Sequence, residues 1–415
     1  MTSHHRLQRR RAPLAFRAIE AAGRALATLG LAIPPLDEQE LCAAACRKTR
    51  LSDFGDERFR PLFRQRLLDL QNLPERLAVL GRLVARFYFL RALSNRLLIE
   101  QQIKEHPEIL RVAVPRPLVI AGLARTGTTL LLNLLAQDPG SRSLLLGEGL
   151  APAVPRPGRG GADPRFRRAA RLVWLANRLV PQLRSIYIVD GDVSVECGML
   201  FRNTFLPHDG MVRDVQQWRD QFSPETWEWA YREYHRQLQL LQWQRPASDH
   251  WLLKWPQHLS SLDILVKTVP DVAIVQTHRN LAHVVPATCQ MIGRFSFFLS
   301  GERWERMPQH VLAMTTEILR RSVEARQRIP SGRVFDVNYD RLVADPIGVL
   351  RDLYDHFGYR YTDQYAARVQ AWLEQHPPPR REERYYDLEQ FGLDRTSFEE
   401  AFAFYYQRFG LDSGT

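Results

Sequence analysis

The sequence has little lysine and little cysteine for a chain of 415 residues. Only four of its 57 basic residues are lysines, so arginine carries nearly all of the positive charge. We interpret this as a compositional bias, which makes an arginine cluster less informative and a lysine within a motif more informative. The four cysteines are too few and too scattered for a disulfide framework. We therefore expect a reduced, intracellular protein in the cytoplasm.

Long uncharged apolar runs are also missing. None reaches the ~20 residues that a helix needs to span a bilayer. Leu14 to Ile33 predicts an apolar helix after a basic start, but charged residues interrupt it and no clean signal-peptide cleavage site follows. We expect this helix to pack against the domain, with a peripheral contact to a membrane surface as the alternative. The net charge of +11 favours anionic ligands, acidic membranes or nucleic acid without choosing among them.

Helical periodicity dominates the first part of the chain, and alternating elements dominate the rest. Apolar residues from Glu38 to Leu110 recur at helical spacing, which predicts an N-terminal helical extension over residues 1–112. Residues 113–415 are expected to form an α/β domain with helical insertions, because short buried apolar runs alternate with helices. This alternation is typical of a P-loop-type, doubly wound parallel sheet flanked by helices. The predicted strands are residues 118–121, 144–146, 251–254, 272–275 and 334–338.

A glycine loop follows the first predicted strand but lacks the lysine of a nucleotide triphosphatase. Gly122 and Gly127 have Walker A spacing between a strand and a helix, an arrangement that points backbone N–H groups at an anion. Thr128 stands where the Walker lysine would be, and the cation of the loop is Arg125 instead. No acidic pair near the loop is placed for Mg²⁺, on which phosphoryl transfer from a triphosphate relies. We therefore expect a phosphate-binding loop in which Arg125 supplies the positive charge that the Walker lysine supplies in a nucleotide triphosphatase.

Three further charged groups follow predicted strands, at the edge where ligands of open α/β sheets bind. Glu148 comes after strand 144–146, and it is either a general base for a hydroxyl nucleophile or a solvated loop carboxylate. Lys254 ends the next strand and could stabilise a leaving-group anion, with His258 close behind it. Arg279 follows the fourth strand. Two separated cationic positions suggest a ligand with two phosphate groups some distance apart.

Together these residues resemble the sulfotransferases that use 3′-phosphoadenosine-5′-phosphosulfate (PAPS), above all the broad bacterial sulfotransferase family. The protein-tyrosine sulfotransferases have similar motifs. The likeness covers about residues 110 to 410 and rests on several motifs in order. The matching segments are Arg125-Thr-Gly-Thr-Thr129 for the 5′-phosphosulfate loop, Leu253-Lys-Trp-Pro-Gln-His258, Thr277-His-Arg-Asn280 for the 3′-phosphate, and Tyr339-Asp-Arg-Leu342 with Asp345-Pro346.

The resemblance implies metal-free, in-line transfer of a sulfuryl group from PAPS to an acceptor hydroxyl, with adenosine 3′,5′-bisphosphate (PAP) as the second product. Lys254 would stabilise the transferring group. Glu148 would take the acceptor proton, although its match to the tyrosine-sulfating branch contains a small insertion. His258 is the second candidate base, because cytosolic sulfotransferases use a histidine soon after a comparable lysine. The donor would be held by Arg125, Thr126, Gly127, Thr128, Thr129, Arg279, Thr288 and Tyr339.

One position departs from the family pattern. The family usually has a serine eight residues after the phosphate-binding arginine, and here that position is Ala287. Either the neighbouring Thr288 replaces it, or the 3′-phosphate is held less tightly. A hydrogen bond to a charged group is worth about 1.5–3 kcal/mol, so the loss would weaken donor binding without abolishing it.

Three other functions stay open at this point. A P-loop kinase using ATP and Mg²⁺ is disfavoured by Thr128. A basic nucleic-acid-binding protein is disfavoured because the arginines are spread along the chain and no binding module is recognisable. A catalytically lapsed family member is disfavoured because Arg125, Glu148, Lys254 and Arg279 are all present.

The acceptor is expected to be the hydroxyl of a small molecule, a glycan or a lipid. Its pocket should be formed by residues 152–243, where Phe201, Phe205, Trp218 and Phe222 suit an apolar acceptor or the protein core equally well. The sequence does not indicate an oligomeric state.

Overall fold

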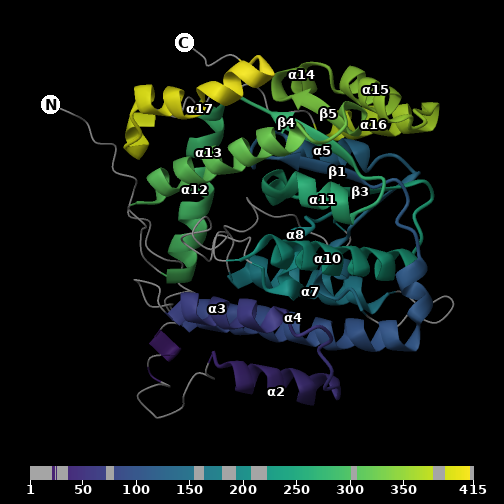
Figure 1. Ribbon diagram of the computed structural model, residues 1–415, viewed down its shortest axis with the longest axis vertical. Helices are drawn as coiled ribbons and strands as arrows, with labels where there is room; N and C mark the ends of the chain where they lie inside the picture. Colours follow the sequence, from purple (N-terminus) through teal and green to yellow (C-terminus); the bar gives the residue numbers. More distant parts are fainter. Residues whose placement is uncertain are drawn as a thin grey trace.

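A parallel sheet forms the centre of the computed structural model, which describes residues 21–23, 25, 36–71, 79–153, 163–179, 193–206, 222–300, 306–376 and 388–411. In the described part of the chain the sheet has five strands in the order β2-β3-β1-β4-β5, and helices surround it (Figure 1). The α/β fold predicted from the sequence is confirmed. The strands are β1 (Leu118–Gly122), β2 (Ser141–Ser143), β3 (His250–Lys254), β4 (Ala273–His278) and β5 (Val334–Asn338).

The order of the strands determines where a ligand can bind. After β1 the chain moves to one side for β2 and β3, and then to the other side for β4 and β5. In sheets of this kind the crevice beyond the carboxyl ends of the strands opens where the chain changes sides. That place is the end of β1, where the glycine loop lies.

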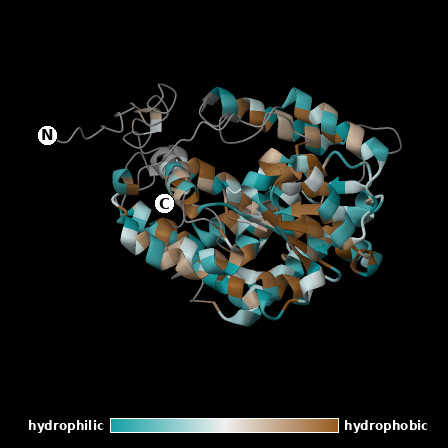
Figure 2. Cartoon of the chain, turned by 90° about the horizontal axis from the view of Figure 1, so that it is seen from above, coloured by the Kyte–Doolittle hydropathy of each residue, from teal (hydrophilic) through white to brown (hydrophobic). Residues whose placement is uncertain are grey.

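Each central strand is buried on both faces, as expected for a parallel sheet covered by helices. Leu118 and Ile120 pack in one apolar cluster with helices α5 (Thr128–Leu135), α15 (Pro346–Phe357) and α16 (Asp363–Gln375). Val119 and Ala121 face the other way, into the larger cluster that holds most of the remaining helices. Alternate residues of β1 therefore contribute to two separate cores. Figure 2 shows the strands as largely hydrophobic, with hydrophilic residues gathered on the outer helices.

The second predicted strand was misplaced by three residues. Residues 144–146 are not a strand; β2 is Ser141–Ser143, and Leu146 begins helix α6 (Leu146–Leu150). The apolar Leu144–Leu146 triplet instead leaves the sheet, and the Leu144 carbonyl accepts a hydrogen bond from Val195 N at 2.8 Å. Buried Arg142 occupies the middle of the real strand, which hid it from a search for apolar runs.

The helices follow the predicted pattern closely in most places. Asp345 caps α15 as predicted, accepting from Gly348 N at 2.9 Å, and Gly358 ends this helix with a positive φ. The larger helices are α2 (Glu38–Thr49), α3 (Phe59–Gln71), α4 (Val79–Glu105), α5 (Thr128–Leu135), α7 (Pro164–Leu179), α10 (Pro224–Gln244), α11 (Leu262–Thr268), α12 (Leu281–Ser300), α13 (Met307–Arg326), α14 (Tyr339–Ala344), α15 (Pro346–Phe357), α16 (Asp363–Gln375) and α17 (Arg395–Phe409). Shorter ones are η1 (Pro107–Arg111), α8 (Gly198–Phe201), η3 (Arg202–Thr204), η4 (Pro256–Ser261), η5 (Ser331–Arg333) and η6 (Leu388–Phe391).

No described helix is both long and apolar enough to cross a membrane. The apolar helix predicted over residues 14–33 lies outside the described residues except for 21–23 and 25, which are helical. A membrane contact through that helix therefore stays a prediction.

The N-terminal helices α2, α3 and α4 form a layer beyond α7 and α10, on the far side from the C-terminal helices (Figure 1). Leu41 and Phe63 from this layer belong to the same apolar cluster as Val119 and Trp251 of the sheet. The extension thus shares a core with the rest of the protein. The boundary at residue 112 between a helical extension and an α/β domain remains a prediction.

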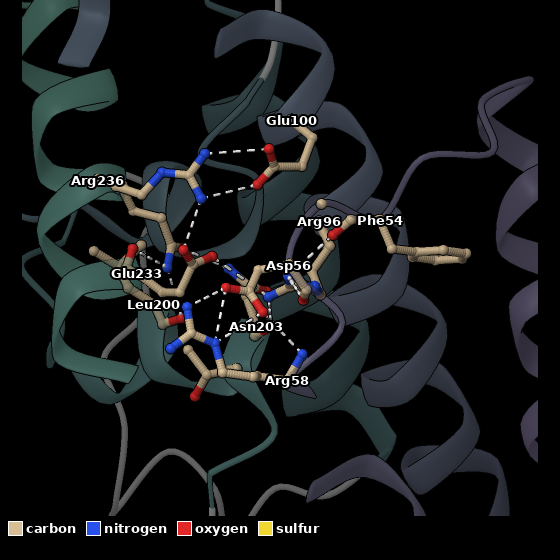
Figure 3. Close-up of polar contacts among 12 residues, drawn as sticks. Phe54, Asp56, Arg58, Arg96, Glu100, Leu200, Asn203, Glu233 and Arg236 are labelled. Atoms are coloured by element: carbon tan, nitrogen blue, oxygen red, sulfur yellow. Dashed lines mark hydrogen bonds and ion pairs between the residues drawn. The ribbon is translucent and has the colours of Figure 1, made fainter. Parts of the chain in front are cut away.

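A buried polar network joins α4 to α10 and to the segment that contains α8 and η3 (Figure 3). The guanidinium of Arg96, which is 3% exposed, donates to the carbonyl oxygens of Phe54, Asp56 and Asn203 at 3.0–3.3 Å. Arg236 donates to both carboxylate oxygens of Glu100 at 3.0 and 3.1 Å. Polar groups buried with partners in this way fix the relative position of the elements that carry them.

Candidate active site

The glycine loop joins β1 to α5, and a contact with β4 holds it in place. Thr126 Oγ1 donates to the Leu123 carbonyl at 2.6 Å and lies 2.6 Å from Thr277 Oγ1. A side chain at Gly122 would collide with Thr277, so glycine is needed for this close approach. Arg125 and Gly127 both have positive φ values, of 73° and 88°. A non-glycine residue held in this conformation is often found where a loop is shaped for a ligand.

The loop residues predicted to hold the donor divide into supporting and accessible ones. Thr126 and Thr128 are buried, with 1% and 3% of their surfaces exposed. Arg125 and Thr129 are exposed, so a guanidinium and a hydroxyl are open to a ligand beside the helix N-terminus.

Arg279 and Tyr339 meet the loop from the next two strands. Arg279 Nη1 donates to the Arg125 carbonyl oxygen at 3.0 Å. Its guanidinium lies over the Tyr339 ring, 4.0 Å from the ring centroid. A Cβ on Gly127 would lie 2.8 Å from the same ring, so this position has no room for a side chain. The structure thus brings two of the predicted donor-binding side chains, those of Arg279 and Tyr339, against the backbone of the loop.

Lys254 ends β3 beside β1 and reaches the start of α5. Its Nζ atom donates to Thr129 Oγ1 at 3.3 Å and to Glu196 Oε1 at 2.6 Å. The lysine side chain is 7% exposed and the glutamate side chain 37% exposed. The Lys254 ammonium group is therefore held beside the loop by hydrogen bonds to one hydroxyl and one carboxylate.

Glu148 lies on α6 and is completely buried. Oε1 accepts from Arg142 Nη2 at 2.9 Å and from Arg245 Nε at 3.1 Å. Oε2 accepts from Leu145 N at 3.1 Å and from Arg245 Nη2 at 3.3 Å. Burial pushes the pKa of Glu148 upward, but the charges of the two arginines outweigh it and the pKa is lowered. Among the described residues no contact joins this carboxylate to the loop or to Lys254, so its role as base remains a prediction.

His258 lies on η4, and it too is fully buried. Its Nδ1 atom pairs with the Tyr231 hydroxyl at 3.0 Å, and the rings of Phe201 and Trp255 pack against it edge-on. Burial lowers the pKa of His258 to about 3, so the ring is neutral at physiological pH and is a weak base. Its candidacy as the catalytic base also remains a prediction.

Thr288 is buried on α12, with Ala287 next to it, and each is less than a tenth exposed. Within the described part of the chain, no hydrogen bond links Thr288 to Arg279. Its proposed contact with the 3′-phosphate therefore still depends on the resemblance alone.

Two of the four aromatic residues that the sequence offered for an acceptor pocket lie in the core. Phe201 stacks on Trp255 at 4.5 Å between ring centroids, and Phe205 packs on Phe63 at 4.6 Å. Both are buried core residues, and Phe222 is half-buried. Trp218 lies outside the described residues.

No group of three or more His, Cys, Asp or Glu side chains in the described ranges is arranged to hold a metal ion. Metal-free transfer remains a prediction about the reaction.

A sequence profile of the sulfotransferase family matches residues 117–363, more than half of the chain. The match begins at β1 and includes all the site residues described above. The chain belongs to the sulfotransferase family. The family match thus agrees with the relationship that the order of the motifs indicated.

Solved structures of mycobacterial sulfotransferases have the same fold. STF1 of Mycobacterium tuberculosis H37Rv aligns with a TM-score of 0.76 and 29% identity, over 88% of this chain and 98% of STF1. STF9 of Mycobacterium avium aligns with a TM-score of 0.80 and 25% identity, over 91% of this chain and 98% of STF9. Each of these alignments covers a larger share of the chain than the family match does.

Among curated relatives, the omega-hydroxy-beta-dihydromenaquinone-9 sulfotransferase Stf3 of Mycobacterium bovis is 24% identical over 159 residues. Stf3 of Mycobacterium tuberculosis CDC 1551 gives the same values. The matched part is 38% of this chain and 40% of Stf3.

Glu196 was missed by the sequence analysis. It lies 58 residues before Lys254 and follows neither a predicted strand nor a glycine loop. The contact is seen only in the folded chain, where Glu196 and the Thr129 hydroxyl both accept hydrogen bonds from the Lys254 ammonium group.

Proposed function

We propose that this sulfotransferase takes PAPS as its sulfuryl donor and transfers the group to the hydroxyl of an apolar small-molecule or lipid acceptor. The position of Lys254 carries the proposal. Its ammonium group bonds to Thr129 at the start of α5, where a phosphosulfate held by the loop would place its charge. Preorganised positive charge at the point where a leaving-group anion forms is an effective way to accelerate group transfer.

On the donor side, the exposed guanidinium of Arg125 and the N–H groups of residues 126–129 would hold the 5′-phosphosulfate. Arg279 would hold the 3′-phosphate, with Tyr339 supporting its guanidinium from one face. Thr288 would assist at that phosphate. Planar, bidentate guanidinium groups suit phosphate recognition, which is consistent with arginine at both places.

An apolar acceptor is supported by the relatives and by the expected pocket region. The curated relatives named for a hydroxylated menaquinone derivative act on the hydroxyl of a lipid-like molecule. In this chain the insertion between β2 and β3 contributes α7, α8 and α10, which carry many aromatic residues. We propose a cytoplasmic protein, since all four cysteines are free.

A thermal-shift comparison of PAP, ATP with Mg²⁺, and no ligand tests the donor. A ligand present at a hundred times its Kd stabilises a folded protein by about 2.7 kcal/mol, so binding of PAP should raise the melting temperature clearly. Stabilisation by ATP and Mg²⁺ alone would favour the kinase alternative and contradict the proposal. Incubation with ³⁵S-labelled PAPS and a panel of hydroxyl compounds then tests the transfer itself.

A further inference from the structure

The two carboxylates that could act as the base, those of Glu148 and Glu196, differ in their burial and in their hydrogen bonds. Glu148 is fully enclosed, and each of its oxygens accepts two hydrogen bonds. The side chain of Glu196 is 37% exposed, and its one described hydrogen bond is to Lys254. A general base must come within hydrogen-bond distance of the proton that it removes. Glu196 is accessible to an acceptor hydroxyl without any rearrangement of buried ion pairs.

The backbone around Glu196 is held against the ends of β2 and β3. Val195 N donates to the Leu144 carbonyl at 2.8 Å, and Cys197 N donates to the Lys254 carbonyl at 2.9 Å. A Cβ at Gly198 would lie 2.7 Å from the Trp255 indole nitrogen, so this turn fits closely over the residue after Lys254. The carboxylate therefore projects from a fixed backbone, and a group carried in this way keeps its position relative to the loop.

The wider surroundings make the same segment rigid. Asn203, just beyond α8, accepts from Asn95 Nδ2 at 3.1 Å and donates to Gln237 Oε1 at 2.8 Å. Its carbonyl oxygen accepts from Arg96 (Figure 3). Helix α4 thus supports the segment that positions Glu196.

Lys254 connects the two sides of the site. Its Nζ atom contacts Thr129 on the loop and Glu196 on the insertion between β2 and β3. Any sulfuryl group within reach of this ammonium would therefore lie close to the Glu196 carboxylate as well. An acceptor hydroxyl that approaches the sulfur from the insertion side would meet that carboxylate.

We propose that Glu196 is the general base of this sulfotransferase, an assignment that rests on the proposed function above. As the acceptor oxygen forms its bond to sulfur, the O–H bond breaks and its proton moves to the Glu196 carboxylate. The bond between sulfur and the phosphate oxygen breaks, and its electron pair stays on that oxygen of PAP. Lys254 offsets the new negative charge, and Glu196 later returns the proton to water. The role predicted for Glu148 then becomes that of a buried structural anion.

The test uses acceptors that differ in how much they need a base. The variant Glu196→Gln keeps the size of the side chain and an oxygen for Lys254, but it cannot accept a proton. With an aliphatic alcohol we expect kcat to fall by about 10²- to 10⁴-fold, the usual contribution of a general base. With 4-nitrophenol, assayed at a pH above its own pKa so that it is largely ionised, the loss should be no more than a few-fold. An equal loss on both acceptors would show that Glu196 only positions Lys254 and would overturn the assignment, as would unchanged activity on both.

Two controls separate this proposal from others. Glu228→Gln removes a carboxylate that pairs with Lys267 on the surface, and it should leave transfer to both acceptors unchanged. If Glu148→Gln, not Glu196→Gln, shows the acceptor-dependent loss, then Glu148 is the base and our assignment is wrong. PAP binding is measured on the same samples. If PAP does not stabilise the wild type, or if the wild type transfers sulfate to neither acceptor, the proposed function itself is contradicted. If Glu196→Gln binds PAP normally and transfers to the alcohol normally, only the assignment of the base is contradicted.

Discussion

The proposed donor side and the proposed acceptor side of this site are built in different ways. The donor side consists of residues at the ends of adjacent strands: Arg125 after β1, Lys254 on β3 and Arg279 after β4. The acceptor side comes from the insertion between β2 and β3, where helices and turns reach the site through tertiary packing. The strand ends converge because the sheet is parallel, whereas the insertion has to be fixed by its own contacts. Each of these proposed donor-side residues therefore ends or follows a strand that the sequence reveals locally, whereas the proposed base follows no such signal.

The two carboxylates show the same contrast. Glu148 follows the loop-helix at a plausible spacing, yet it folds into an ion pair with Arg142 and Arg245. Glu196 has no motif around it, yet it contacts Lys254. Four experiments can sharpen or break this division, beginning with the largest expected effect.

Replacing Glu148 by glutamine should cost stability and not chemistry. The change leaves the Arg142 charge buried without its partner, and breaking a buried pair in this way costs about 3–5 kcal/mol. Because the pKa of Glu148 is lowered on folding, its contribution is present above the ordinary carboxyl pKa and is lost as the pH falls through the lowered value. Wild type should therefore lose part of its stability at acidic pH, and Glu148→Gln should lack this part of the loss in urea titrations.

The control for that experiment is Asp352→Asn, which removes an exposed pair with Arg341. A solvated pair of this kind is worth about 0–1 kcal/mol, so the midpoint should hardly move. If Glu148→Gln were as stable as wild type but inactive on alcohols, the assignment of Glu148 to structure would be wrong.

Replacing Lys254 by methionine should slow turnover by about 10²- to 10³-fold, the typical cost of removing one preorganised charge-stabilising donor. The effect should appear in kcat measured with saturating PAPS. Lys267→Met is the matched control, because this lysine is exposed and pairs only with Glu228 in the described structure. A wild-type kcat in Lys254→Met would contradict the proposed function, because that proposal depends on Lys254.

Replacing Arg279 by alanine should weaken PAP binding by roughly 10- to 100-fold, since a hydrogen-bonded contact to a charged group is worth about 1.5–3 kcal/mol. Adenosine 5′-phosphosulfate lacks the 3′-phosphate, so its affinity should hardly change. Calorimetry on both ligands measures the difference. An equal loss for both would mean that Arg279 acts through the loop, by its bond to the Arg125 carbonyl, and does not bind the 3′-phosphate.

Replacing Asn95 by alanine should have the smallest effect. Its side chain donates to the Leu150 carbonyl and to Asn203, and so links α4 to both carboxylate-bearing segments. Losing such buried hydrogen bonds costs about 1–3 kcal/mol. The transition midpoint in urea should fall while PAP affinity stays unchanged. A change in PAP affinity would show that the N-terminal layer acts on the donor side, contrary to the division proposed here.

The sequence predicted the positions of the loop and of the neighbouring strand ends, because each of them is a local signal. Gly122, Gly127 and Arg125 identify the loop, and buried apolar runs place Lys254 and Arg279 at strand ends. β2 could not be located in the same way, because its central residue is a buried arginine and the nearby leucines lie beyond the strand.

The different surroundings of Glu148 and Glu196 could not be predicted, for a physical reason. Whether a glutamate becomes a buried ion-pair partner or an exposed base depends on which arginines and lysines the fold brings to it. Arg245 lies 97 residues from Glu148, and Lys254 lies 58 residues from Glu196. No periodicity or spacing within one segment carries that information.

The most direct test of the division is a calorimetric titration of PAP into wild type, Arg279→Ala and Glu196→Gln. Our account predicts a roughly 10- to 100-fold higher Kd for Arg279→Ala and a Kd within a few-fold of wild type for Glu196→Gln. Weakening of PAP binding by Glu196→Gln to the same degree, or unchanged binding in Arg279→Ala, would contradict it.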